Sequence, residues 1–95
     1  MKLLTIAIPC YNSQEYMEHA INSALIGGDD IEIIIVDDGS SDNTLEIAKQ
    51  YEEKYPTIVR AIHKENGGHG SAVNTGIEHA EGVYFKVLDS DDWLD

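Results

Sequence analysis

The 95-residue sequence predicts an α/β fold with a mostly parallel sheet, in the order β-α-β-α-β-α-β. Short apolar runs alternate along the chain with segments whose apolar residues recur every three or four positions. The apolar runs are almost continuous and rich in Ile and Val, which is typical of parallel strands covered on both faces. Because strands joined by helices run parallel with right-handed crossovers, we expect three layers, α/β/α, in a Rossmann-like arrangement.

Four strands are expected, over residues 3–8, 31–36, 58–62 and 83–88. The first is expected to end at Pro9, and the second to end before Asp37 and Asp38. We take the strand order to be 3-2-1-4, by analogy with doubly wound folds, in which the order reverses beside the first strand.

Three helices are expected between these strands, over residues 14–26, 43–55 and 71–80. Ser13 is expected to be the N-cap of the first helix, which Gly27 and Gly28 end. Asp42 or Ser41 can cap the second helix.

Composition excludes several classes of protein. The chain has 6 Lys and Arg against 18 Asp and Glu, and its net charge of -12 disfavours nucleic acid as a partner. The single cysteine, Cys10, fits a reducing compartment, and we expect it to be a small core residue rather than a nucleophile. No signal peptide and no apolar run of about 20 residues is visible. We therefore expect a protein that is cytoplasmic, either free or peripheral at the inner face of the membrane.

A polar cluster follows each expected strand, at residues 9–13, 37–41, 63–70 and 89–92. In a parallel sheet all four clusters lie along the carboxyl edge, where ligands bind. With the order 3-2-1-4, the loop at Tyr11 and Asn12 faces the carboxylates of residues 89–92 across a crevice.

Asp89, Asp91 and Asp92 are the strongest candidates for a ligand site. Carboxylates this close repel one another unless a cation neutralises them. Hard oxygen ligands suit Mg²⁺ or Mn²⁺, and such ions usually bring phosphates with them. The alternative is an Asx-rich turn with solvated carboxylates, but the position after a buried strand favours the cation site.

The other clusters are more ambiguous. Asp37 and Asp38 can accept hydrogen bonds from a base or a ribose, or cap the next helix. Tyr11 can stack on a flat base or simply be half-buried at a strand exit. The glycine-rich segment 66–70 precedes a helix and can cradle phosphate, or it can be an ordinary mobile loop. His69 in this segment is a candidate ligand contact.

In order and spacing, these segments resemble the N-terminal part of family 2 glycosyltransferases, the nucleotide-diphospho-sugar transferases of GT-A fold. The resemblance covers essentially the whole chain, and five motifs in register make it specific. The five motifs are residues 8–12 (IPCYN), residues 35–44 (IVDDGSSDNT), the glycine-rich motif made of 66–68 (NGG) and 70–77 (GSAVNTGI), residues 80–82 (AEG) and residues 88–93 (LDSDDW).

The family resemblance implies a UDP-, GDP- or dTDP-linked sugar donor and a Mg²⁺ or Mn²⁺ ion. It implies that Pro9 and Tyr11 line the base pocket, that Asp38 contacts the base and that Asp91 reaches the ribose. The metal is expected on Asp91 and Asp92. The full set implied to bind the nucleotide sugar is Pro9, Tyr11, Asn12, Asp37, Asp38, Gly70, Asn74, Asp89 and Asp91.

The resemblance also implies a reaction, the inverting transfer of a sugar to a hydroxyl of a polysaccharide, lipid or glycan acceptor, as in cell-envelope biosynthesis. The family's catalytic base lies beyond Asp95, so residues 1–95 are interpreted as a truncated, donor-binding part that self-associates through an unpaired strand edge. One alternative is a non-catalytic nucleotide-binding module. The other is a metal-dependent phosphotransfer domain, which needs an aspartate after the first strand, where this chain has Cys10, Tyr11 and Asn12.

Overall fold

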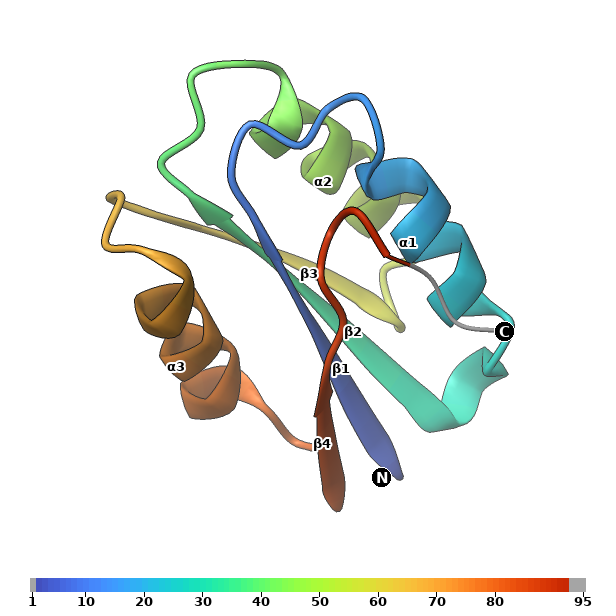
Figure 1. The fold of residues 1–95 in the computed structure, drawn as a ribbon. Helices are drawn as coiled ribbons and strands as arrows, with labels where there is room; N and C mark the ends of the chain where they lie inside the picture. The colour runs from blue at the N-terminus through green and yellow to red at the C-terminus, as the bar shows by residue number, and fades with distance from the viewer. Residues whose placement is uncertain (1, 93–95) are drawn as a thin grey trace.

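A computed structural model describes residues 2–92 of the chain and shows the expected parallel sheet (Figure 1). The strands are hydrogen-bonded in the order β3-β2-β1-β4, which confirms the predicted order. The strands are β1 (Leu4–Cys10), β2 (Ile31–Asp38), β3 (Val59–Lys64) and β4 (Tyr84–Val87). The helices are α1 (Met17–Leu25), α2 (Thr44–Lys54) and α3 (His69–His79), with a short 3-10 helix, η1 (Gly28–Asp30), before β2.

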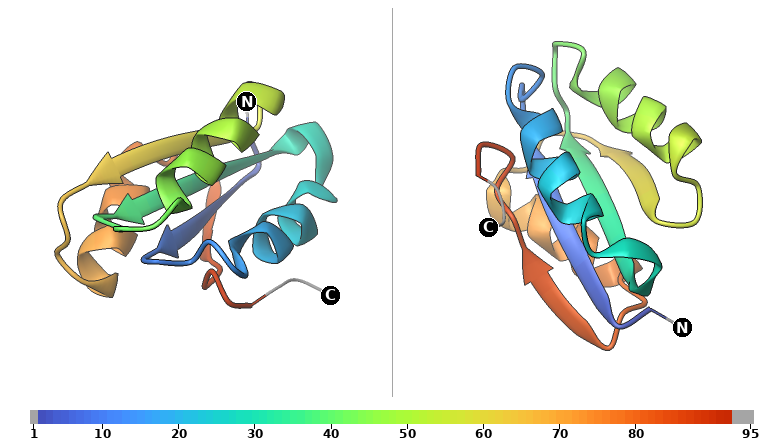
Figure 2. Two further views of the ribbon diagram at one scale, coloured as in Figure 1. Left: turned by 90° about the horizontal axis from the view of Figure 1, so that it is seen from above. Right: turned by 90° about the vertical axis from the view of Figure 1, so that its right-hand side faces the viewer.

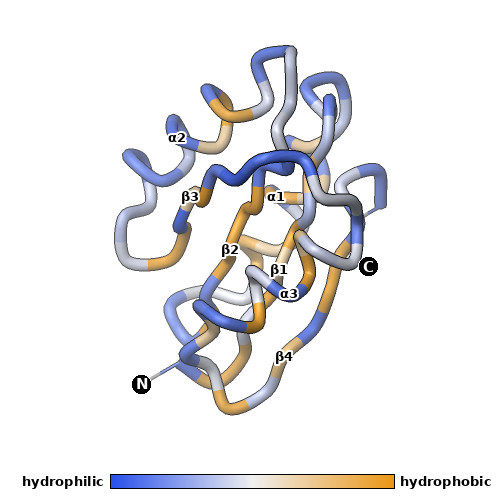
Figure 3. The backbone as a smooth tube through the Cα atoms, turned by 90° about the vertical axis from the view of Figure 1, so that its left-hand side faces the viewer, coloured by the Kyte–Doolittle hydropathy of each residue, from blue (hydrophilic) through white to orange (hydrophobic). Residues whose placement is uncertain are grey.

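The predicted three layers are present, with α1 and α2 on one face of the sheet and α3 on the other (Figures 1 and 2). Side chains alternate between the two faces of each strand, so Ile33 and Ile35 pack towards α1 and α2 while Ile34 and Val36 pack towards α3. Both faces of β1 and β2 are therefore buried, and Figure 3 shows hydrophobic colouring along these strands and hydrophilic loops at their ends.

Strand β1 runs through Pro9 to Cys10, so the prediction that it ends at Pro9 is wrong. Pro9 lies opposite Val36 in the register with β2. The main-chain N–H and C=O groups of successive residues point to opposite sides of the strand, and Ala7 O, on the β4 side, accepts a hydrogen bond from Leu88 N. Pro9, two residues on, faces that same side beyond the end of the β4 pairing, where its missing N–H removes no ladder bond.

The first helix begins at Met17, three residues later than predicted, and Ser13 is not its side-chain cap. Ser13 O accepts hydrogen bonds from the amides of Tyr16 and Met17, which forms a turn before the helix. The Ser13 hydroxyl instead bonds the backbone of Tyr11 and lies 2.7 Å from the Ser90 hydroxyl. A residue expected to start a helix therefore joins two loops at the carboxyl edge.

Strand β2 includes Asp37 and Asp38, which were predicted to lie in the following loop. Both residues are buried, at 1% and 3% exposure. Because successive residues of a strand point to opposite faces, Asp37 faces the α1 and α2 layer and Asp38 faces the α3 layer. This difference of two residues decides the role of each carboxylate.

Strand β4 forms one edge of the sheet among the described residues and pairs only with β1. Its residues are mostly exposed, including Tyr84 at 65% and Phe85 at 36%, and Val83 just before it is 55% exposed. No helix within residues 2–92 has the length and hydropathy needed to cross a membrane.

Candidate functional site: the carboxyl edge of the sheet

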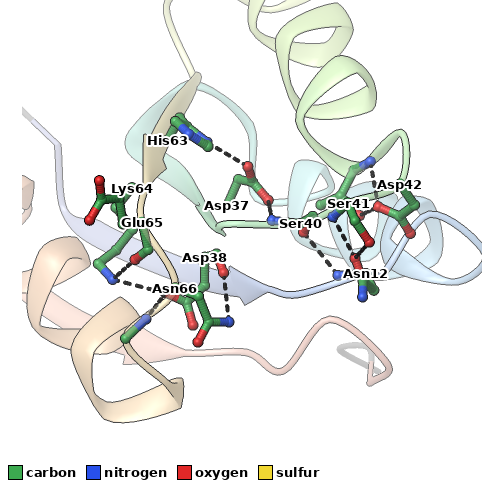
Figure 4. Close-up of polar contacts among 12 residues, drawn as sticks. Asn12, Asp37, Asp38, Ser40, Ser41, Asp42, His63, Lys64, Glu65 and Asn66 are labelled. Atoms are coloured by element: carbon green, nitrogen blue, oxygen red, sulfur yellow. Dashed lines mark hydrogen bonds and ion pairs between the residues drawn. The ribbon is translucent and has the colours of Figure 1, made fainter.

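Asp38 anchors the loop between β3 and α3. Its Oδ1 accepts hydrogen bonds from Lys64 Nζ at 2.8 Å and Gly67 N at 2.9 Å, and its Oδ2 accepts one from Gly68 N at 3.0 Å. Asn66 Nδ2 donates to the Asp38 carbonyl at 3.0 Å (Figure 4). Burial opposes ionisation of Asp38, but the bonds from Lys64, Gly67 and Gly68 outweigh it and hold its pKa below the usual value. The ionised carboxylate thus holds the loop that leads into α3.

Asp37 is engaged on the opposite face of the sheet. Its Oδ1 accepts a hydrogen bond from Ser40 N at 3.1 Å, and its Oδ2 lies 2.7 Å from His63 Nδ1 (Figure 4). Cys10 is its neighbour in the β1–β2 register. Burial, together with the negative charge of Asp37, raises the pKa of the Cys10 thiol to about 12. The thiol is only 1% exposed, so the prediction of a small core cysteine is confirmed.

Asn12 joins the loop after β1 to the loop after β2. Its Oδ1 accepts a hydrogen bond from Ser41 N at 2.8 Å, and its own N donates to Ser40 Oγ at 2.9 Å (Figure 4). Its φ of 48° is left-handed, a conformation that Asn tolerates better than most residues. Asn12 therefore supports the site by holding these two loops together rather than by lining it.

Gly39 allows the loops after β2 and β3 to approach each other closely. Its φ is +72°, and a Cβ at this position would lie 2.6 Å from Asn66 N. Only glycine suits both the conformation and the space.

The loops after β1 and β4 enclose a shallow hollow of about 230 Å³ with the first residue of α3. This edge hollow contains Pro9, Tyr11, Asp89 and Asp91, four of the predicted site residues, and Tyr11 faces the two carboxylates as expected. Tyr11 is 54% exposed, so its ring is available to a ligand. The residues that line the edge hollow are Pro9, Tyr11, Ser13, Tyr16, His69, Asp89, Ser90 and Asp91.

The other predicted site residues lie outside the edge hollow. Asn74 is exposed on α3 and Gly70 is exposed in the first turn of the same helix. Asp92 is exposed and its backbone N donates to Asp89 O at 3.0 Å. Larger hollows lie along α2, lined by residues such as Glu46 and Gln50, and share no residue with the edge hollow.

The acidic residues at the exit of β4 suit a divalent cation that carries its own ligands. In residues 2–92, no group of three or more His, Cys, Asp and Glu side chains is close enough to enclose a metal ion. Mg²⁺ and ions like it, however, usually keep several waters and bind through one or two carboxylates plus the phosphates of a substrate. The exposed carboxylates of Asp89 and Asp91, open to the same hollow as Tyr11, fit a site of that kind.

Sequence reasoning missed four residues that shape this edge: Lys64, Ser13, Tyr16 and Ser90. Lys64 ends β3 and balances Asp38, while the other three line the edge hollow. Side chains alternate between the two faces of β3, and this alternation places Lys64 on the same face as Asp38. It is the sequence signal from which Lys64 could have been predicted. Nothing local in the sequence marks the contact between Ser13 and Ser90, which are 77 residues apart.

A family model for glycosyl transferase family 2 matches residues 5–95 of the chain. The chain belongs to this family. A Rickettsia conorii protein described as an uncharacterized glycosyltransferase is 50% identical over 93 residues, which cover 95% of this chain and 15% of that protein. The family 2 chain thus spans only a small part of such relatives.

Solved structures agree with the family and with the GT-A fold. Staphylococcus aureus TarS, solved in complex with UDP-GlcNAc, matches with a TM-score of 0.86 and 31% identity, over 100% of this chain and 28% of the TarS chain. The mannosyltransferase PcManGT of Pyrobaculum calidifontis, solved with GDP-Man and Mn²⁺, matches with a TM-score of 0.82 and 26% identity. That match covers 93% of this chain and 27% of PcManGT.

Proposed function

We propose that this family 2 chain is the N-terminal, donor-binding part of a metal-dependent, inverting glycosyltransferase. The observation that carries the proposal is the edge hollow, where Pro9 and Tyr11 face Asp89 and Asp91 at the carboxyl edge of the sheet. The complexes of TarS with UDP-GlcNAc and of PcManGT with GDP-Man and Mn²⁺ support a nucleotide sugar as the ligand. The donor is a nucleotide-diphospho-sugar, and the acceptor is a hydroxyl of a polysaccharide, lipid or glycan.

Three residues of the edge hollow, Pro9, Tyr11 and Asp91, have chemistry suited to binding the nucleoside. The exposed ring of Tyr11 stacks against the base, with Pro9 beside it. Asp91 accepts a hydrogen bond from a ribose hydroxyl. Asp38 reaches the base only by giving up bonds to the loop that it now holds, so its main task here is to position that loop.

Asp91 and Asp92 are the residues that would hold Mg²⁺ or Mn²⁺, with Asp89 completing the acidic cluster. A bound divalent ion stabilises negative charge on the departing nucleotide diphosphate. The protein's own contribution is to hold the acidic turn at the exit of β4, with Asp89 and Asp91 open to the edge hollow, through the contact between Ser90 and Ser13.

We assign no catalytic base within residues 2–92. Inverting transfer needs a carboxylate that takes the proton from the acceptor hydroxyl. Asp37 and Asp38 are buried and already bonded, and Asp89 and Asp91 serve the donor in this proposal. We therefore expect residues 1–95 to bind donor without transferring sugar, and detectable transfer by this chain alone would contradict the assignment.

Titration calorimetry with UDP, GDP and dTDP, each with and without Mn²⁺, tests the proposal. We expect one of the nucleotides to bind, and Mn²⁺ to strengthen its binding. Asp91→Asn should remove the effect of Mn²⁺, whereas Asp30→Asn, the same change in the exposed η1 turn, should preserve it. Absence of binding by every nucleotide in both conditions would overturn the proposal.

The phosphotransfer alternative gains no support, because Cys10 at the position of the required aspartate is buried and its thiol has a pKa of about 12. The uncovered strand β4, with Val83 and Tyr84 exposed, supports our expectation that the chain self-associates. Light scattering that finds only monomers would contradict it. A cytoplasmic or peripheral-membrane location remains our expectation for the whole protein.

A further inference from the structure

The edge hollow is lined by acidic side chains and by one histidine, His69. Two of its lining side chains, Asp89 and Asp91, are carboxylates. Among the described residues that line it, His69 is the only side chain able to carry a positive charge. Lys64, the cation at the end of β3, is committed to Asp38 at 2.8 Å. Of the described residues that line this hollow, His69 is therefore the one whose side chain suits contact with an entering diphosphate.

His69 is held in place from two directions. It is the first residue of α3, set there by the turn at Gly68, whose φ is 93°. Its Nε2 lies 2.9 Å from Asp89 Oδ1, across the hollow's rim from α3 to the exit of β4. Its side chain is 64% exposed, and within residues 2–92 its Nδ1 makes no hydrogen bond. One ring nitrogen is thus used for orientation while the other is open to a ligand.

We propose that His69 is a donor-binding residue whose Nδ1–H hydrogen-bonds the diphosphate of the nucleotide sugar, with Asp89 as the residue that positions it. This inference rests on the proposed function. The ring has two nitrogens on opposite sides, so one can face the Asp89 carboxylate while the other faces a phosphate in the hollow. A hydrogen bond from a ring N–H to a phosphate is charge-assisted, because the phosphate is ionised.

A purely structural role for the pair predicts a different outcome. If His69 and Asp89 only tie α3 to the exit of β4, then breaking the pair distorts the whole hollow and weakens base and phosphate binding together. If His69 contacts the diphosphate, its loss weakens the binding of nucleoside diphosphates and leaves the nucleosides nearly unaffected.

Titration calorimetry of the 95-residue chain with UDP and uridine, and with GDP and guanosine, separates these outcomes. His69→Gln keeps a polar side chain but cannot carry the charge, and His79→Gln, at the other end of α3, is the matched control. We expect His69→Gln to weaken binding of the preferred nucleoside diphosphate about tenfold. Nucleoside binding should stay within about twofold, and His79→Gln should bind both ligands as the unmodified chain does.

Each result has a distinct meaning. An equal loss for nucleoside and diphosphate, or no loss for either, overturns the role of His69 while the proposed function stands. Failure of the unmodified chain to bind any nucleotide overturns the proposed function and this inference with it. Repeating the series in EDTA shows whether the effect of His69→Gln persists without a divalent ion, as a direct contact requires, and its disappearance there would overturn the contact. Thermal unfolding of each variant confirms that the chain remains folded.

Discussion

Replacing Asp38 with Asn tests whether this carboxylate holds the loop between β3 and α3. Three hydrogen bonds reach it, from Lys64 Nζ, Gly67 N and Gly68 N, at 2.8, 2.9 and 3.0 Å. Asn keeps the shape and one acceptor oxygen, but it removes the negative charge and turns an NH₂ group towards one set of donors. Lys64, whose side chain is 19% exposed, loses its counter-charge.

The size of the effect follows from these contacts. A hydrogen bond to a charged group contributes about 1.5–3 kcal/mol, and breaking a buried ion pair costs about 3–5 kcal/mol. Lys64 keeps some contact with water and one acceptor remains, so we expect a loss near the lower end, about 3 kcal/mol. For a domain of this size that lowers Tm by roughly 15 °C.

Urea unfolding followed by circular dichroism measures the loss, and amide hydrogen exchange locates it. In Asp38→Asn the amides of Gly67 and Gly68 should exchange faster, because they lose their acceptor. Asp30→Asn makes the same chemical change at an exposed position and should alter the free energy of unfolding by less than about 0.5 kcal/mol. A loss below about 1 kcal/mol for Asp38→Asn, with both amides still protected, would refute the anchoring role and leave the carboxylate free for a ligand.

Three further predictions concern packing, thiol chemistry and pH. Gly76→Ala puts a Cβ 2.8 Å from the Ala7 Cβ, so urea unfolding should show that the free energy of unfolding falls by about 1–2 kcal/mol. Gly70→Ala, with open space around the added Cβ, should leave stability unchanged or raise it slightly. Equal effects of the two substitutions would contradict the packing argument. Because burial raises the pKa of the Cys10 thiol to about 12, a thiol reagent at pH 8 should label it only in urea; rapid labelling of the folded chain would show otherwise. The pKa of Asp38 is lowered on folding, so its stabilisation is complete above the unfolded carboxyl's pKa of about 3.9 and is lost as the pH falls through the lower folded value. Urea unfolding from pH 7 to pH 2.5 should therefore show that the free energies of unfolding of the unmodified chain and of Asp38→Asn approach each other only below about pH 4. A difference in free energy that stays the same at acid pH would contradict this account.

The sequence by itself determined the architecture of the sheet and which edge carries the chemistry. Continuous Ile and Val runs alternating with amphipathic segments leave few ways to bury apolar surface other than a parallel sheet between helices. The carboxyl ends of parallel strands lie along one edge of the sheet. Once the strand order was assumed, it followed that Tyr11 lies near Asp89 and Asp91.

Tertiary structure alone decided which carboxylates face a ligand and which hold the protein together. Asp37 and Asp38 looked alike as neighbours in the sequence, yet the extension of β2 by two residues sends them to opposite faces, to His63 and to Lys64. The same holds for Ser13, which resembles a helix cap but lies against Ser90 in the folded chain. The spacing of apolar residues in a short stretch of sequence shows whether that stretch forms a helix or a strand. The partner of a polar side chain depends instead on strand register and on contacts between segments far apart in the chain, which a short stretch of sequence does not contain.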